Sequence, residues 1–299
     1  MKNPRFIDSA SDAQLAFANL HIPARTAQQY SQEALYAMTS GSYRGPNGDP
    51  VDWHAAVNYA VKKSQTIEPG KYHGGLYRPG PHENYTIFAN QDALTVASWM
   101  ASRLHSPGAM YLNPLFDRPL VLVFGNGENP GAFLNGGRSQ EDFLCRSSAL
   151  FACQRESTFY NINKRYPPGH FSDTAIYSPQ VPFFRAPNGQ TLDQPLQLDL
   201  LTCAAPNAAA IGHQLATALM QKRVYSMLYI AAAKGHENLV LGAWGCGHNG
   251  LHPKIVAHIF REALNGEFRG EFNVITFAIS DWSPERRFLR PFAHVFGAI

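Results

Sequence analysis

Short apolar runs that alternate with helical segments constrain the fold of this chain more than any other feature of its sequence. The first run, 120–124 (LVLVF), is apolar throughout, and further extended runs follow at 175–184, 196–203, 238–243 and 272–279. Helical segments are expected between them, at 140–158, 208–233 and 252–264. Strands without a polar face are typical of parallel or mixed sheets that are buried between helices. The pattern therefore predicts an α/β fold for residues 116–299.

The first 115 residues differ from the rest, because their apolar residues recur at helical spacing. Helices are expected at 24–39, 52–63 and 92–104. Residues 67–86 are rich in Gly, Pro, His and Tyr and are expected to form a long loop. No Pro/Ser-rich linker separates this front from the α/β part. We therefore expect residues 1–115 to form a helical N-terminal extension that packs on a core of residues 116–299.

Composition excludes several classes of protein. Hydrophobic residues make up 45% of the 299 residues, which is enough for a sizeable core and argues against global disorder. The formal net charge is +3, and no run of Lys and Arg suggests a nucleic-acid partner. The longest apolar run, 227–233, is far shorter than a membrane span of about 20 residues. With no signal peptide before Asp8 and no disulfide framework, we expect a cytoplasmic protein without a membrane partner, and non-classical secretion stays open.

Two glycine-rich loops each follow a predicted buried strand and precede a predicted helix. They are 124–142 (FGNGENPGAFLNGGRSQED) and 240–253 (VLGAWGCGHNGLHP). Glycine lets backbone N–H groups approach a ligand, and a helix start offers unpaired N–H groups to a phosphate. Neither loop has the spacing of a dinucleotide fingerprint or of a Walker loop. Two such loops at one sheet edge predict a diphosphate site, although glycine-rich turns also occur as tight connections without a ligand.

The helix after the first loop begins with Ser139-Gln140-Glu141-Asp142. A carboxyl group at such a site can protonate a leaving oxygen or activate a water during cleavage of a glycosidic bond. The same residues also fit a capping box, in which Ser139 and Asp142 satisfy each other's backbone N–H groups. The sequence alone supports both interpretations.

These segments resemble a known family. Residues 121–154 (VLVFGNGENPGAFLNGGRSQEDFLCRSSALFACQ) resemble the signature of microbial poly(ADP-ribose) glycohydrolases, which are macrodomain enzymes that hydrolyse ADP-ribose linkages. Residues 175–185, 201–208 and 240–253 resemble later blocks of that family, in the same order. The resemblance implies a three-layer α/β/α macrodomain with a mixed sheet and an N-terminal helical extension. Its first loop would surround the ribose that is cleaved, and its second loop would hold the diphosphate.

The resemblance also implies the residues of the site. Gln140-Glu141-Asp142 stands where the family has Gln-Glu-Glu, so Glu141 would orient ribose hydroxyls and Asp142 would be the general acid. The implied substrate-binding residues are Asn129, Gly131, Phe133, Asn135, Gly136, Gly137 and Gln140 in the first loop and Gly245, Cys246, Gly247, His248, Asn249 and Gly250 in the second. Phe124 and Asn207 are further candidates near the adenine. No metal and no cofactor are implied, and the partner is the ADP-ribose moiety of a modified protein or polymer.

The chain departs from the family pattern at the expected cleavage site. Asp142 is one methylene shorter than Glu, Gly131-Ala132-Phe133 replaces three glycines, and His248-Asn249 replaces an aromatic residue. A polar pair favours a polar leaving group over a stacked ribose. We therefore expect a hydrolase that removes ADP-ribose from a protein side chain. A classical poly(ADP-ribose) glycohydrolase and a catalytically inactive ADP-ribose reader remain alternatives.

Two other functions are disfavoured by spacing. Cys246, His248 and His252 could suggest a metal site, but their spacing matches no zinc pattern. An NAD-dependent oxidoreductase would need a glycine fingerprint that the chain lacks. Cys145 and Cys153 lie among apolar residues of a predicted helix and are expected to be buried core thiols.

Overall fold

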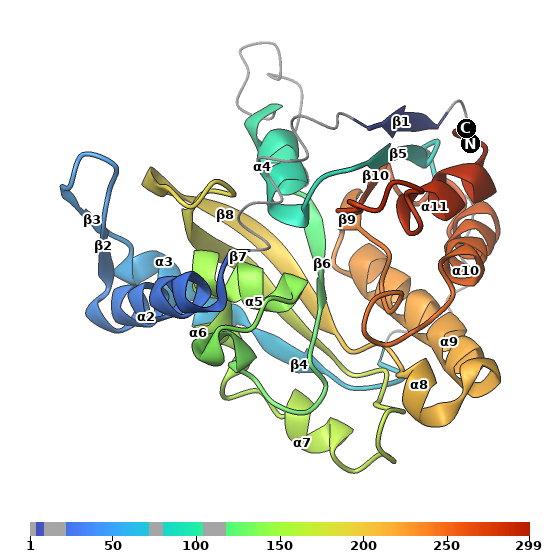
Figure 1. The fold of residues 1–299 in the computed structure, drawn as a ribbon, viewed down its shortest axis with the longest axis horizontal. Coiled ribbons are helices and arrows are strands. Elements are labelled where there is room, and N and C mark those ends of the chain that lie inside the picture. The colour runs from blue at the N-terminus through green and yellow to red at the C-terminus, as the bar shows by residue number, and fades with distance from the viewer. Residues whose placement is uncertain (1–3, 9–21, 72–79, 104–117) are drawn as a thin grey trace.

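In the part of the chain that the structure describes, eight strands form one mixed sheet with helices on both faces (Figure 1). This computed structural model describes residues 4–8, 22–71, 80–103 and 118–299. The strand order is β1-β5-β10-β9-β6-β8-β7-β4. Neighbours are parallel from β1 to β8 in this order, and β7 and β4 add two antiparallel pairs at one edge. The strands are β1 (Arg5–Ile7), β4 (Gln65–Ile67), β5 (Tyr85–Ala89), β6 (Leu120–Phe124), β7 (Ala175–Arg185), β8 (Thr191–Cys203), β9 (Asn238–Leu241) and β10 (Val274–Ala278).

The helices divide between two layers. One layer contains α9 (His213–Ala233), α10 (Pro253–Asn265) and α11 (Leu289–Phe296). The other contains α2 (Ala24–Ser40), α3 (His54–Lys63), α4 (Ala93–Arg103), α5 (Gln140–Ser147) and α6 (Leu150–Gln154). Short connections are formed by the hairpin β2 (Ser42–Arg44) and β3 (Pro50–Asp52), the 3₁₀ helix η1 (Ala132–Asn135), α7 (Phe159–Asn163) and α8 (Ala208–Ile211). None of the helices in these described segments is long and apolar enough to cross a membrane.

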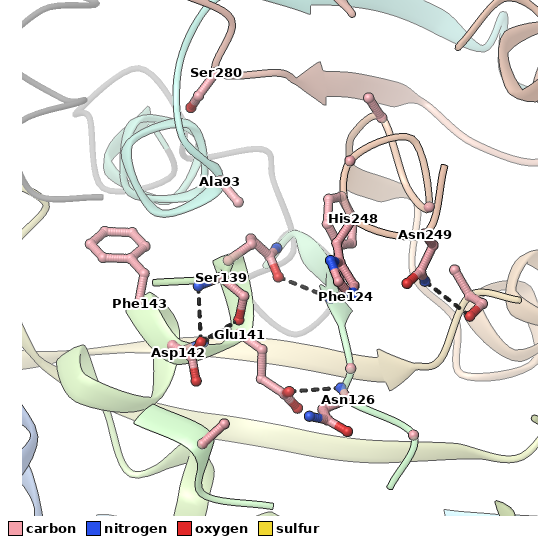
Figure 2. Close-up of a pocket in the computed structure, with 18 of the residues that line it drawn as sticks. Ala93, Phe124, Asn126, Ser139, Glu141, Asp142, Phe143, His248, Asn249 and Ser280 are labelled. Carbon is pink, nitrogen blue, oxygen red and sulfur yellow. Dashed lines mark hydrogen bonds between the residues drawn. The ribbon is translucent and has the colours of Figure 1, made fainter. Parts of the chain in front are cut away.

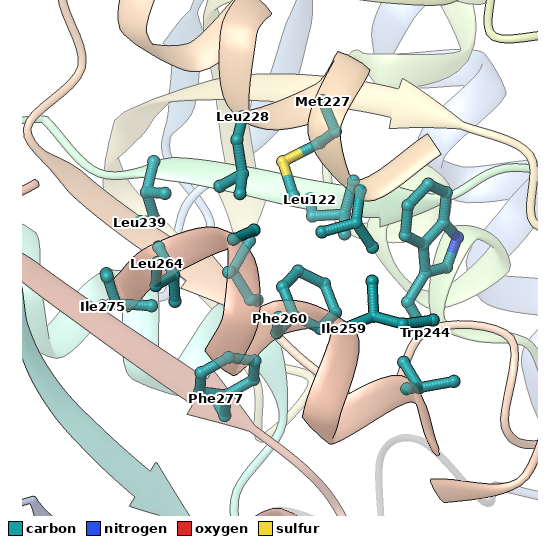
Figure 3. Packing of buried hydrophobic residues seen from close by; sticks show 14 of the residues in the cluster. Leu122, Met227, Leu228, Leu239, Trp244, Ile259, Phe260, Leu264, Ile275 and Phe277 are labelled. Carbon is teal, nitrogen blue, oxygen red and sulfur yellow. The ribbon is translucent and has the colours of Figure 1, made fainter. Parts of the chain in front are cut away.

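Strand β6 shows why the apolar runs fold into this sheet. Leu120 and Leu122 pack in the layer of α9, α10 and α11, whereas Val121 and Val123 pack in the layer of α2 to α6. Successive side chains of a strand point to opposite faces, so a strand that is buried on both faces must be apolar at every position. Figure 3 shows the first layer, in which Leu122 shares a cluster with side chains of α9, α10 and β10. The expected α/β fold with a mixed sheet is confirmed.

The expected helix 140–158 is broken. It ends as α5 at Ser147, and α6 begins at Leu150. The Ser148 Oγ donates to Leu144 O at 2.7 Å, and the Ala149 N–H donates to Pro182 O of β7 at 3.0 Å. The chain therefore turns toward the sheet between the two helices, because this backbone bonds to β7 in place of the preceding helical turn. The expected helix 208–233 is also interrupted, at Gly212, whose φ of 83° is not helical.

The first 115 residues are not purely helical. The expected helices 24–39, 52–63 and 92–104 correspond to α2, α3 and α4, with residue 104 outside the described residues. However, β1, β4 and β5 all belong to the large sheet, and β5 pairs with β10 along its whole length. The predicted loop 67–86 is therefore wrong at its ends, where Ile67 and Tyr85 belong to strands. The predicted boundary between 115 and 116 lies outside the described residues, and the division into extension and core stays a prediction.

Candidate active site

A cavity of about 610 Å³ lies where the parallel strands end (Figure 2). Its wall includes the segments that follow β5, β6, β8, β9 and β10, which are the places where α/β sheets bind ligands. The polar and aromatic residues of the wall are Asp92, Phe124, Asn126, Glu128, Ser139, Gln140, Glu141, Asp142, Phe143, Phe171, Asn207, His248, Asn249, Ser280 and Phe288. Both glycine-rich loops therefore meet at one cavity, as the sequence predicts.

Gln140 attaches the start of α5 to the end of β6. Its Nε2 donates to Leu122 O at 2.8 Å, and its Oε1 accepts from the Phe124 N–H at 2.9 Å. The side chain thus makes the hydrogen bonds to the β6 backbone that a neighbouring strand would make, at the carboxyl end of the strand. As a result, the two acidic residues that follow are placed beside the first loop.

Glu141 is 6% exposed, and its carboxyl is held at two points. Oε2 accepts from the Asn126 N–H at 2.7 Å, and Oε1 accepts from Nε2 of Gln154 at 2.9 Å. Burial raises the pKa of Glu141 to about 8, the Asn126 N–H lowers it, and the neighbouring charge of Asp142 adds to the rise. Burial thus favours the protonated form of Glu141, although its carboxyl lines the cavity.

Asp142 completes the capping box. Its Oδ2 accepts from the Ser139 N–H at 2.9 Å and from the Ser139 Oγ at 2.6 Å. In return, the Asp142 N–H donates to the Ser139 Oγ at 3.2 Å. Asp142 therefore has the structural role that the sequence allowed for it, while its carboxyl also borders the cavity (Figure 2).

The second loop forms the opposite wall. Gly245 has φ 77°, a conformation that other residues adopt at a cost, and a Cβ there would lie 2.6 Å from Leu251 Cδ1. A Cβ added to Gly247 would meet no atom within 4 Å. The Asn249 amide donates to Ala205 O at 3.1 Å, so that side chain braces the loop, whereas His248 is exposed at the cavity.

About half of the expected site residues line the cavity. Those in the wall are Gln140, Glu141, Asp142, Gly245, Gly247, His248 and Asn249, together with the adenine candidates Phe124 and Asn207. Those outside it are Asn129, Gly131, Phe133, Asn135, Gly136, Gly137, Cys246 and Gly250.

Several residues of 131–137 pack against α2 and α6, whereas Ala132 of η1 borders the cavity. Phe133 is fully buried, with its ring centroid 5.1 Å from that of Phe151, and its carbonyl accepts from Ser31 of α2 at 2.7 Å. A Cβ at Gly136 would lie 2.8 Å from Ala24 O. These glycines and Phe133 thus shape the loop rather than border the cavity. Cys246 is 5% exposed, and its thiol faces Trp244 O, which places it in the core.

Several wall residues were missed from the sequence. Asp92 precedes α4 and accepts from the Thr95 N–H at 2.8 Å, and burial raises the pKa of its carboxyl. An acidic residue before a helix is a common cap, so its place in the wall has no sequence signal of its own. Asn126 lies within the first glycine loop and could have been included. Phe171 and Ser280 lie in segments without a recognisable motif. The expectation that Cys145 and Cys153 are buried thiols is confirmed.

The comparisons with known proteins identify the family. The model of the microbial-type PARG catalytic domain matches residues 31–186, which is just over half of the chain. The chain belongs to this family. No protein with a curated description matches the chain at a comparable level.

Solved structures of glycohydrolases resemble the chain over most of its length. Poly(ADP-ribose) glycohydrolase from Thermomonospora curvata is 32% identical, with a TM-score of 0.77 over 91% of this chain and 100% of that chain. The same enzyme bound to the inhibitor ADP-HPD is 32% identical, with a TM-score of 0.76 over 90% of this chain and 99% of that chain. The Deinococcus radiodurans enzyme in complex with ADP-ribose is 30% identical, with a TM-score of 0.71 over 81% and 98%. The fold is therefore macrodomain-like, and the chain is an ADP-ribose glycohydrolase.

Proposed function

We propose that this glycohydrolase releases ADP-ribose from a modified protein side chain, with Glu141 as the proton donor. The observation that carries the proposal is a buried carboxyl on the cavity wall that is held at both oxygens and whose pKa is raised to about 8. An acid catalyst is most effective when its pKa is close to the pH at which it works. The ADP-ribose and ADP-HPD bound by the related enzymes support an ADP-ribose moiety as the ligand of this cavity.

The reaction needs one acid and one water. The C1″–O bond, or the C1″–N bond of an Arg linkage, breaks, and its electron pair leaves with the side-chain oxygen or nitrogen, which takes the proton of Glu141. A water then bonds to C1″ and gives a proton to the Glu141 carboxylate, which restores the acid. The positive charge that develops on the ribose is stabilised by the neighbouring Asp142 carboxylate and by the diphosphate.

This assignment moves to Glu141 the acid role that the resemblance implied for Asp142. Asp142 is shorter than Glu and accepts hydrogen bonds from Ser139 through Oδ2, so its carboxyl caps the start of α5. Its charge also helps to keep Glu141 protonated. The second glycine loop, with Gly245 and Gly247 in the wall, is assigned to the diphosphate.

Of the polar pair His248-Asn249, only His248 supports a polar leaving group. His248 is exposed at the cavity, whereas the Asn249 amide is bonded to Ala205 O. An imidazole can donate a hydrogen bond to a protein side chain and can also accept one from it. A cytoplasmic location without a nucleic-acid partner remains part of the proposal and rests on the low net charge and the four buried free thiols.

The test compares linkages. The protein is incubated with poly(ADP-ribose) and with proteins that carry a single ADP-ribose on Ser, Thr or Arg, and free ADP-ribose is measured, with Glu141→Gln as the matched control. We expect faster release from one protein linkage than from the polymer, and release that is slower by roughly two to four orders of magnitude with the control variant. Faster release from the polymer would contradict the protein substrate. Binding without release from every linkage would instead identify a reader.

A further inference from the structure

A buried glutamine outside the cavity wall contacts the proposed acid. Gln154 is the last residue of α6 and is fully buried. In a continuous helix, at 1.5 Å per residue, it would lie about 20 Å along the axis from Glu141. The break at Ser148 and Ala149 folds α6 back, and the Gln154 Nε2 comes to lie 2.9 Å from Glu141 Oε1. The break therefore makes this contact possible.

The amide of Gln154 has a defined orientation. Its Nε2 also donates to Thr202 Oγ1 of β8 at 3.1 Å, and its Oε1 accepts from the Cys145 thiol at 3.5 Å. A flipped amide would place its carbonyl oxygen against the Glu141 carboxyl, which is unfavourable whenever that carboxyl is ionised. An amide buried at this depth costs free energy unless it is hydrogen-bonded, and here every polar atom of the amide has a partner. Because Thr202 belongs to β8, Gln154 connects Glu141 to the central sheet.

We propose that Gln154 is a positioning residue for the cleavage, which fixes the Glu141 carboxyl against the cavity. The inference rests on the proposed function of Glu141. The Asn126 N–H and the Gln154 amide each donate to one oxygen of the Glu141 carboxyl, so the plane of that carboxyl cannot rotate freely. The Gln154 hydrogen bond lowers the pKa of Glu141 and so acts against the rise that burial causes. Gln154 thereby fixes the direction of the carboxyl and contributes to the balance between its protonated and ionised forms.

The test replaces Gln154 with Met, which has a similar shape but no N–H group. We expect kcat for ADP-ribose release from a mono-ADP-ribosylated protein to fall at least about tenfold, with KM within about threefold. The alkaline limb of the kcat profile should move to higher pH by roughly one unit. The same shift should be seen by NMR in the titration of the ¹³C-labelled Glu141 carboxyl, assigned with Glu141→Gln. Thr202→Val is the matched control: it removes an acceptor of Gln154 but leaves the bond to Glu141, so its shift should be much smaller.

The two proposals fail in different ways. If Glu141→Gln is inactive but Gln154→Met keeps the parent kcat and the parent titration of Glu141, the positioning role is overturned and the acid role stands. If Glu141→Gln stays active, the acid role is overturned. An upward shift of the Glu141 titration in Gln154→Met would then still support the contact, whereas an unchanged titration would overturn it too.

Discussion

Glu141 and Asp142 are neighbours in the chain, but their carboxyls have different surroundings. Asp142 faces the start of its own helix and bonds to Ser139, whereas Glu141 bonds to the first loop through Asn126 and to α6 through Gln154. The sequence predicted the capping box and both acids. It did not predict that burial would raise the pKa of Glu141, or that its carboxyl would bond to Gln154, because both depend on how residues further along the chain fold against it.

Burial of Glu141 should make the protein less stable at high pH. Its pKa rises from 4.5 to about 8 on folding, so its protonated form is favoured in the folded state. The contribution of the Glu141 proton to the free energy of unfolding is complete below about pH 4.5 and is lost as the pH rises through about 8. We expect Glu141→Gln to be more stable than the parent by up to about 5 kcal/mol above pH 8, and equally stable near pH 4. Thermal unfolding across this range measures the difference, and a constant difference would contradict the raised pKa.

At the scale of elements, the strands after residue 115 were predicted better than the helix ends there, whereas the strands before residue 115 were missed. Runs such as 120–124 are apolar on both faces, and β6 has those bounds. Helix ends depended on contacts that the sequence does not show, such as the bond from Ala149 to Pro182 that separates α5 from α6. The glycine loops were recognised, but the turn of η1, which buries Phe133, was not. For that reason the second loop was predicted better than the first.

The second loop allows a matched pair of substitutions. Gly247→Val places its side chain in open space on the cavity wall, so we expect ADP-ribose binding to be abolished while the fold is kept. Gly245→Val should instead destabilise the fold, because of its positive φ and its contact with Leu251. Calorimetric titration with ADP-ribose and thermal unfolding separate the two effects. Unchanged affinity in Gly247→Val would remove this loop from the site.

Over the whole molecule, the sheet joins the two halves of the chain. β5, from the first 115 residues, pairs with β10 from the C-terminal part, and Phe88 stacks on Phe277 with ring centroids 5.2 Å apart. The sequence predicted the α/β class, but it did not predict this pairing, since short strands such as β1 and β4 lack a periodic pattern long enough to recognise.

The pairing gives a prediction about truncation. A fragment of residues 116–299 would lose β1, β4 and β5 and would expose the edge of β10 and the face of Phe277. We expect this fragment to aggregate or to unfold without cooperativity, as measured by circular dichroism during heating. A cooperative transition like that of the full chain would show that the C-terminal part is an independent domain.

The rates of Glu141→Gln and Asp142→Asn, measured under single-turnover conditions at neutral pH, test the central claim most directly. Both variants keep the shape of the side chain, and Asn still offers Ser139 an acceptor. We expect Glu141→Gln to lose roughly two to four orders of magnitude in the rate of ADP-ribose release, and Asp142→Asn to lose no more than about tenfold. The opposite result, with Asp142→Asn inactive and Glu141→Gln affected mainly in binding, would make Asp142 the acid and contradict the assignment.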